Sequence, residues 1–165
     1  MKSRPLPKRA ARRALPVRER NRRLGALGLS RHDEEEVQGE ALAIVARFRA
    51  WTHLEPCCVT GWRTGEVHEF EGQPWRVVVE WAHITGTRGA FNPDFGCAAP
   101  LVDLLHRRQE DDPEFFTRRG LDPCELARRH AVRFFAAYPQ DCRWILEHAS
   151  DGDVIALAQL GEEER

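Results

Sequence analysis

Two histidines lie on either side of a polar loop in the middle of the chain. His83 is the last residue of the run WRVVVEWAH, and His106 lies within the run LVDLLHRRQ. The connecting residues 85–96 are rich in Gly, Asn, Asp and Pro. An imidazole that is neutral near pH 7 can take a proton from water or bind a divalent metal ion. Both side chains are therefore candidates for acid–base chemistry or for metal ligation.

Alternating apolar residues predict the elements that carry these two side chains. Residues 66–70 and 74–84 flank a Gly-containing turn, so we expect a β-hairpin. Residues 97–101 are expected to form a short return strand, and residues 101–110 a helix that carries His106. Because side chains alternate along a strand, the longer strand has two faces, which hold Val77, Val79, Trp81 and His83 on one side and Val78, Glu80 and Ala82 on the other.

Further helices are expected around this unit. An apolar periodicity predicts a helix over residues 32–52. Asp-Pro pairs at 112–113 and 122–123 each place a proline at the first position of a helix, and Gly120 ends the first of the two. Two short helices are expected near 140–149 and 151–160. The predicted fold class is α+β, with a central hairpin and metal-site helix wrapped by an N-terminal helix and several C-terminal helices.

Length and composition restrict the class of protein. A chain of 165 residues is long enough for one domain with appendages. It has no run of about 20 apolar residues, so no membrane partner is expected. The N-terminus lacks the apolar segment of a secretory signal. Five cysteines without an even spacing favour reduced thiols and a cytoplasmic location.

The charge is distributed unevenly along the chain. Residues 1–31 hold eleven Lys or Arg and one acid, whereas residues 32–165 hold fourteen Arg and twenty-five acids. We interpret the first segment as a basic, flexible arm and the second as a single domain. Basic side chains displace the counterions of phosphates, so Arg9, Arg12 and Arg13 are candidate nucleic-acid contacts. The alternative is an arm that only increases solubility or docks on the acidic domain.

Several short motifs in the central unit are shared with one family of nucleases. They are Cys58-x-x-Gly61, Glu80-Trp81-Ala82-His83-Ile84, Asp94, Pro100-Leu101 and His106. Together they resemble the HNH (ββα-metal) endonucleases, and most closely the small HNH-type nucleases of phages and their bacterial relatives. The resemblance covers about residues 57–110, and it implies a ββα unit that holds a divalent metal ion.

The resemblance also implies a role for each residue. His83 corresponds to the general base that activates water, and His106 to a metal ligand. Glu110 is a candidate second ligand because it lies four residues further along the same helix. Asp94 is either a ligand or the group that orients His83, and Arg88 in the loop is a candidate phosphate contact. The expected metal is Mg²⁺ or Mn²⁺, with Ni²⁺ or Zn²⁺ as alternatives.

The sequence departs from the family pattern in three places. Ala82 stands where many relatives have a metal ligand, and the Asn of the family name has two alternative counterparts, Asn92 and Asp94. Many relatives also have a structural zinc on two Cys-x-x-Cys pairs, which requires four ligands. The matching positions here are Cys57, Thr60, Val102 and Leu105, so no structural zinc is expected. The alternative is a zinc site built from Cys57, Cys58, Cys97 and either His53 or His68.

The sequence therefore predicts a metal-dependent endonuclease that hydrolyses phosphodiester bonds in DNA, with RNA as an open alternative. A second hypothesis is a non-catalytic nucleic-acid-binding module of the same fold, and a third is an adaptor whose arm binds an acidic protein. Each histidine also has a structural explanation. His83 can be a hydrogen-bonded core residue, and His106 can lie on the solvated face of its helix.

Overall fold

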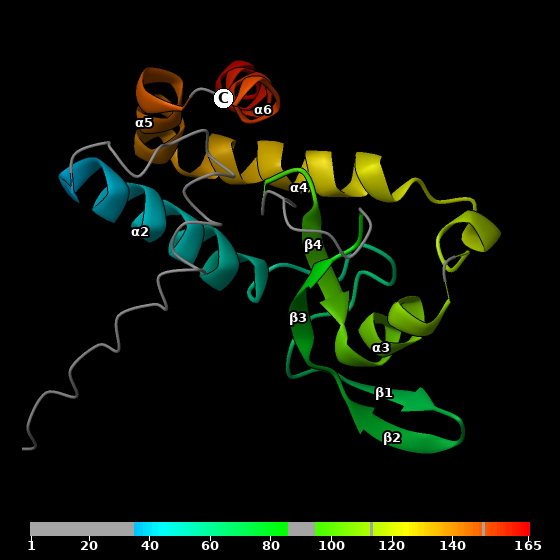
Figure 1. Cartoon of the computed structure of the whole chain (residues 1–165). Coiled ribbons are helices and arrows are strands. Elements are labelled where there is room, and N and C mark those ends of the chain that lie inside the picture. Colours follow the sequence, from blue (N-terminus) through cyan, green and yellow to red (C-terminus); the bar gives the residue numbers. More distant parts are fainter. Residues whose placement is uncertain (1–34, 86–94, 113, 150) are drawn as a thin grey trace, which may run out of the picture.

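The structure is a computed structural model that describes residues 35–85, 95–112, 114–149 and 151–165. The fold is α+β, as predicted, and combines helices with two small antiparallel sheets (Figure 1). The elements in chain order are α2 (Glu35–Thr52), β1 (Val67–Phe70), β2 (Gln73–Arg76), β3 (Val79–His83), β4 (Ala98–Val102), α3 (Asp103–Asp111), the 3-10 helix η1 (Thr117–Arg119), α4 (Pro123–Ala137), α5 (Pro139–His148) and α6 (Gly152–Glu163).

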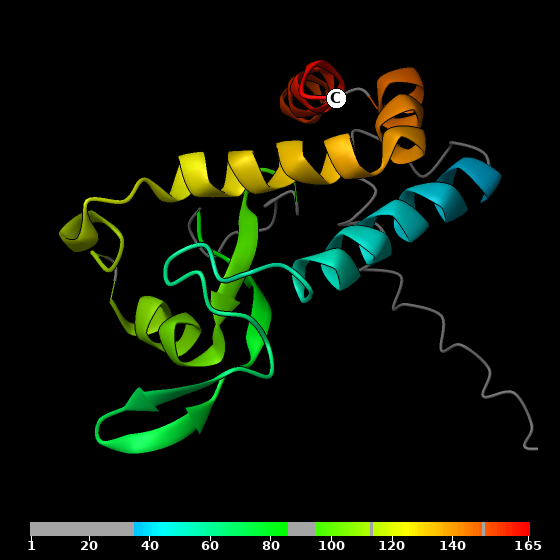
Figure 2. The same cartoon turned by 180° about the vertical axis from the view of Figure 1, so that it is seen from behind.

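The first part of the predicted hairpin is confirmed. Strands β1 and β2 pair antiparallel, with Phe70 opposite Gln73. The two residues between them, Glu71 and Gly72, both have positive φ, at 51° and 77°. A two-residue hairpin loop with two positive φ values matches the right-handed twist of the strands that it joins. The hairpin projects from the end of the molecule opposite to α5 and α6 (Figure 2).

The predicted single strand over residues 74–84 is wrong, because the chain changes its partner in the middle of this run. Val77 still hydrogen-bonds to Glu66, beside β1, but the carbonyl of Val78 accepts from Asp103 at the start of α3. From Val79 onward the chain pairs with β4 instead. Alternation of side chains alone does not reveal such an exchange of partners, since both halves of the run are strands.

The second sheet and the helix after it form the unit that carries the candidate site. Strand β3 pairs antiparallel with β4, in a register that places His83 opposite Ala98 and Val79 opposite Val102. Helix α3 begins immediately after β4 and contacts both strands. The chain therefore follows the order strand, loop, strand, helix. The return strand and the helix were both predicted, and they lie within two residues of the expected bounds.

Two apolar clusters lie on either side of β4, whose five residues are all buried. One cluster is built mainly from α2, α4, α5 and α6, and it includes Phe48, Phe95 and Phe134. The other lies between the two sheets and η1, and it includes Leu101 and Phe115. Because β4 contributes residues to both clusters, it fixes the sheet that carries His83 against the helical part of the molecule.

The helices largely follow the prediction. Asp122 caps α4 by accepting hydrogen bonds from Cys124 and Glu125, with Pro123 at the first helical position. The helix predicted to end at Gly120 is reduced to the 3-10 helix η1, which Gly120 ends with a positive φ of 66°. No helix within the described ranges is long and apolar enough to cross a membrane.

Candidate functional site

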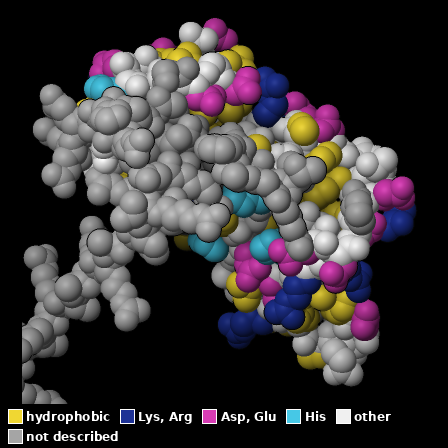
Figure 3. All heavy atoms as spheres, viewed as in Figure 1, with side chains coloured by type: hydrophobic (Ala, Val, Ile, Leu, Met, Phe, Trp, Pro, Cys, Tyr) yellow, Lys and Arg dark blue, Asp and Glu magenta, His cyan; other side chains and the backbone are white. Residues whose placement is uncertain are grey.

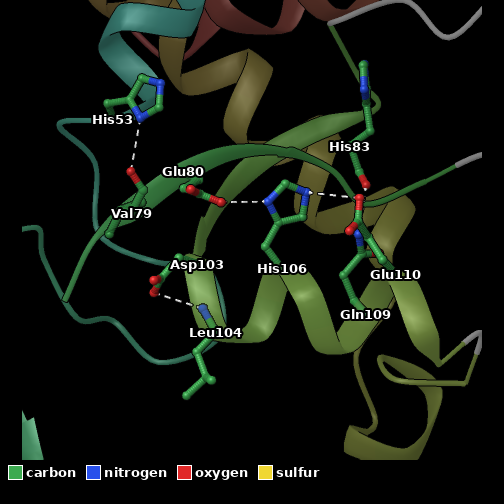
Figure 4. A network of polar contacts seen from close by, with 9 residues as sticks. All are labelled: His53, Val79, Glu80, His83, Asp103, Leu104, His106, Gln109 and Glu110. Carbon is green, nitrogen blue, oxygen red and sulfur yellow. Dashed lines mark hydrogen bonds and ion pairs between the residues drawn. The ribbon is translucent and has the colours of Figure 1, made fainter. Parts of the chain in front are cut away.

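A hydrogen bond between α3 and β3 is the centre of the candidate site. His106 Nδ1 lies 2.9 Å from Glu80 Oε2 (Figure 4). A carboxylate can only accept hydrogen bonds, so the ring hydrogen is on Nδ1 and the lone pair is on Nε2. Histidines that bind metals are usually oriented in this way, by a hydrogen bond from the nitrogen that does not bind. The ring of His106 is therefore fixed with Nε2 as its basic atom.

Glu110 lies on the same face of α3 as His106, as the spacing of four residues predicts. Its Oε1 atom is 3.9 Å from His106 Nε2, and its side chain is half exposed. This separation is longer than a hydrogen bond. The two atoms nevertheless face each other across a gap that is open to solvent on the Glu110 side. The structure thus brings together two of the ligands predicted from the sequence.

The imidazole of His83 is separated from this pair. Figure 4 shows its ring pointing away from His106 and Glu110, while its backbone carbonyl faces α3. That carbonyl accepts a hydrogen bond of 3.3 Å from Gln109, so α3 positions the end of β3 through the main chain. The ring itself packs edge-on against Trp81, with 4.3 Å between ring centroids. His83 and Trp81 share a face of β3, as predicted, and Glu80 lies on the opposite face.

The end of α2 lies against the His83 side of β3. His53 Nδ1 is 3.0 Å from the carbonyl oxygen of Val79. One helical turn earlier, the guanidinium carbon of Arg49 is 4.2 Å from the centre of the Trp81 ring. In the view of Figure 3, histidine and acidic side chains lie near one another on the surface. Strand β3 therefore separates a side next to α3, which carries Glu80, His106 and Glu110, from a side that carries His83 and Arg49.

Other predicted site residues lie outside the described part of the chain. These are Arg88, Asn92 and Asp94 in the loop, and Arg9, Arg12 and Arg13 in the arm. Within the described ranges, no group of three or more His, Cys, Asp and Glu side chains is arranged to hold a metal ion. His106 and Glu110 supply one nitrogen and one carboxylate. This donor set suits a divalent ion that takes its remaining ligands from water, from substrate or from further residues.

Of the cysteines of the alternative zinc site, Cys57 is buried, whereas Cys58 and Cys97 are partly exposed. Cys57 lies in the cluster between the sheets, and Cys58 packs against it. Val102 and Leu105, at the positions that match the second Cys-x-x-Cys pair, are apolar side chains of the same cluster. Burial and the neighbouring Cys57 raise the pKa of Cys58 to about 12, which favours the protonated thiol over the thiolate that metals bind. His53 and His68 have other contacts, since His68 stacks on Trp62 and lies 3.0 Å from Glu66.

Two residues of the site were missed by the sequence analysis. Glu80 was assigned to the face of β3 opposite His83, but no role was derived from this. Since the helix after β4 packs on that same face, the alternation already contained a signal that Glu80 meets a residue of α3. Arg49 belongs to a helix more than thirty residues before His83. Its contact with Trp81 depends on tertiary packing and has no signal in the sequence.

Comparison with known proteins gives no further assignment. No family model, no curated protein and no solved structure matches this chain.

Proposed function

We propose that this chain is a metal-dependent endonuclease of the HNH type, which hydrolyses phosphodiester bonds in DNA. The observation that carries the proposal is the alignment of Glu80, His106 and Glu110, in which a carboxylate orients an imidazole whose second nitrogen faces another carboxylate. The short motifs shared with HNH nucleases and the order strand, loop, strand, helix support the same class.

Each residue has a distinct task in this proposal. His106 Nε2 and Glu110 hold the divalent ion, Mg²⁺ or Mn²⁺, and Glu80 keeps His106 in the required tautomer. The bound ion would offset the charge of the phosphodiester and stabilise the leaving oxygen. His83, at the end of β3, accepts the proton of the attacking water. Gln109 maintains the distance between the end of β3 and the helix that carries the ligands.

A non-catalytic nucleic-acid-binding module is the second candidate. It is favoured by the orientation of the His83 ring away from His106, and by Ala82, which offers no ligand atom at the position next to His83. In this case the pair formed by Glu80 and His106 would only stabilise the packing of α3 on β3.

Plasmid nicking distinguishes the two candidates. The purified chain is incubated with supercoiled plasmid and Mg²⁺, Mn²⁺, Ni²⁺ or EDTA, together with the variants His83→Ala and His106→Ala. The matched control is His148→Ala, which removes an exposed histidine from the end of α5. The nuclease predicts cleavage that requires metal, persists in the control and disappears in both site variants. DNA binding without cleavage under any metal would support the module instead.

A further inference from the structure

The last turn of α2 carries two basic side chains that both reach β3. Arg49 and His53 are four residues apart, and the amide of His53 hydrogen-bonds to the carbonyl of Arg49 at 3.4 Å, so the helical turn continues through His53. Residues at this spacing share one face of a helix. His53 contacts the carbonyl of Val79, and Arg49 lies over the ring of Trp81. The pair is thus anchored on the same strand that ends in His83.

We propose that Arg49 and His53 bind phosphates of the DNA strand that flank the bond cleaved beside His83. This inference rests on the proposed function. It requires a substrate that contains more than one phosphodiester. Val79 and His83 are four residues apart, which corresponds to about 13 Å at about 3.3 Å per strand residue. This distance spans several nucleotide steps of about 3.4 Å along a duplex.

The orientation of both side chains suits an anion. The carbonyl of Val79 can only accept, so the Nδ1 hydrogen of His53 points to the strand and Nε2 points away from it (Figure 4). Nε2 is thus the ring atom that would face a bound phosphate, and an imidazole donates from this atom only when both ring nitrogens carry hydrogen. Arg49 lies over the Trp81 ring, and the planar guanidinium of an arginine carries N–H donors whose geometry matches that of phosphate.

The distribution of charge around β3 supports this assignment. The side of β3 that faces α3 carries Glu80 and Glu110, which attract a cation and, without a bound ion, repel a phosphate. Arg49 and His53 lie on the other side, next to Trp81 and His83. Residues 32–165 carry more acids than arginines, so few positions in this segment offer a positive charge to a DNA phosphate. The phosphates that flank the cleaved bond can therefore lie on the side of β3 next to α2.

Salt-dependent DNA binding tests this inference separately from cleavage. The full chain binds a fluorescein-labelled DNA duplex in EDTA, and anisotropy gives the affinity over a range of NaCl concentrations. The double variant Arg49→Gln/His53→Gln is compared with Arg143→Gln/His148→Gln, which removes the same residue types from α5. His148 is a close match because its Nδ1 also bonds to a backbone carbonyl, that of Trp144, at 2.9 Å.

The plot of log affinity against log salt has a negative slope. We expect the Arg49→Gln/His53→Gln variant to make this slope shallower by about 0.9 for each phosphate that the protein no longer neutralises. The control should keep the slope of the unmodified chain. Arg49→Lys retains the charge and should also keep this slope. If Arg49→Lys and Arg49→Gln reduce the affinity equally, Arg49 acts only by packing on Trp81 and the inference is overturned. It is equally overturned if the Arg49/His53 double variant binds with an unchanged slope.

Cleavage of two substrates completes the test. We expect the Arg49→Gln/His53→Gln variant to cleave plasmid about tenfold more slowly, since fewer basic groups then hold the DNA backbone. It should hydrolyse bis(p-nitrophenyl) phosphate, which has no flanking phosphates, at the rate of the unmodified chain. A chain that cleaves neither substrate but binds DNA through these two residues would refute the nuclease, and with it the cleaved bond, and would leave only phosphate binding by Arg49 and His53. Equal reductions on both substrates would overturn the inference and leave the nuclease in place.

Discussion

Glu80 and His106 are 26 residues apart in the sequence, and their side chains meet at 2.9 Å between β3 and α3. The hydrogen bond fixes the rotation of α3 relative to the strand, and it also decides which nitrogen of His106 is basic. Glu80 is partly exposed, so the hydrogen bond contributes little to folding. Its main consequence is therefore the orientation of the His106 ring.

Glu80→Ala should weaken the binding of Mn²⁺ by about 10- to 100-fold, which is the usual cost of removing the group that orients a metal-binding histidine. Glu80→Gln should cost less, because the amide oxygen still accepts from His106 Nδ1. Calorimetric titration with Mn²⁺ measures both, with Glu69→Gln on β1 as the control. A Glu80→Ala chain that binds Mn²⁺ as tightly as the unmodified chain would contradict the orienting role.

A second prediction concerns the link between α2 and α5. Arg47 donates two hydrogen bonds to Asp141, of 2.8 and 2.7 Å, and the side chain of Asp141 is 2% exposed. The hydrogen bond with Asp141 raises the pKa of Arg47 above its ordinary value. Because Arg47 is itself partly exposed, Asp141→Asn should lower the free energy of unfolding by about 2 kcal/mol, less than for a fully buried pair.

Glu40→Gln is the matched control for this pair, since Glu40 contacts the same guanidinium at 2.7 Å but is 45% exposed. Glu40→Gln should lower the free energy of unfolding by less than about 1 kcal/mol. Urea unfolding of both variants measures the difference. Equal destabilisation of the two variants would mean that the burial of Asp141 does not matter.

The local part of the fold could be predicted from the sequence. Asp122 and Pro123 mark the start of α4, and the helix follows because the cap and the fixed φ of proline act within a few residues. The alternation along β3 predicted the correct faces for Glu80 and His83. The spacing of His106 and Glu110 likewise predicted their common face, since a helix has a fixed period.

Contacts between distant elements could not be predicted in this way. The exchange of partners at Val78 depends on a hydrogen bond to Asp103, and the position of Arg49 depends on how α2 packs on β3. Neither follows from a local period. The direction of the His83 ring could not be predicted either. The strand defines only the face on which the side chain lies, and the packing against Trp81 defines how the ring is turned.

A third prediction uses a close approach between α4 and α6. A Cβ atom at Gly161 would lie 2.5 Å from Cβ of Phe135 and 2.9 Å from the carbonyl oxygen of Val132. Both are much shorter than a van der Waals contact, and the second involves backbone that cannot turn aside. Gly161→Ala should therefore lower the free energy of unfolding by about 1–3 kcal/mol.

Gly39 provides the opposite case within α2. A Cβ atom there would meet no heavy atom within 4 Å. Gly39→Ala should stabilise the chain by up to about 1 kcal/mol, because alanine has the higher helix propensity. Thermal unfolding of the two variants should thus give shifts of opposite sign. Shifts of the same sign would contradict the packing of α6 on α4.

The last prediction concerns His130, which is buried between α2 and α4. Burial, and to a lesser extent Arg133, lowers the pKa of His130 from 6.5 to about 3. Thr52 Oγ1 donates to the carbonyl of Phe48 at 2.8 Å, so it accepts from His130 Nε2 at 2.9 Å. The hydrogen of the neutral ring is therefore on Nε2, and a second proton would place a charge inside the core.

The sign of the pH dependence follows from this shift. Between about pH 6.5 and pH 3 the unfolded chain binds a proton at His130 that the folded chain does not. The contribution of His130 to stability is therefore complete above pH 6.5 and declines as the pH falls, by up to about 1.4 kcal/mol per pH unit. Urea unfolding at several pH values should show a steeper acid destabilisation for the unmodified chain than for His130→Gln, whose amide can still donate to Thr52 but does not titrate. Parallel pH dependences would show that His130 accepts its second proton in the folded state as readily as in the unfolded chain, and that its burial imposes no cost on protonation.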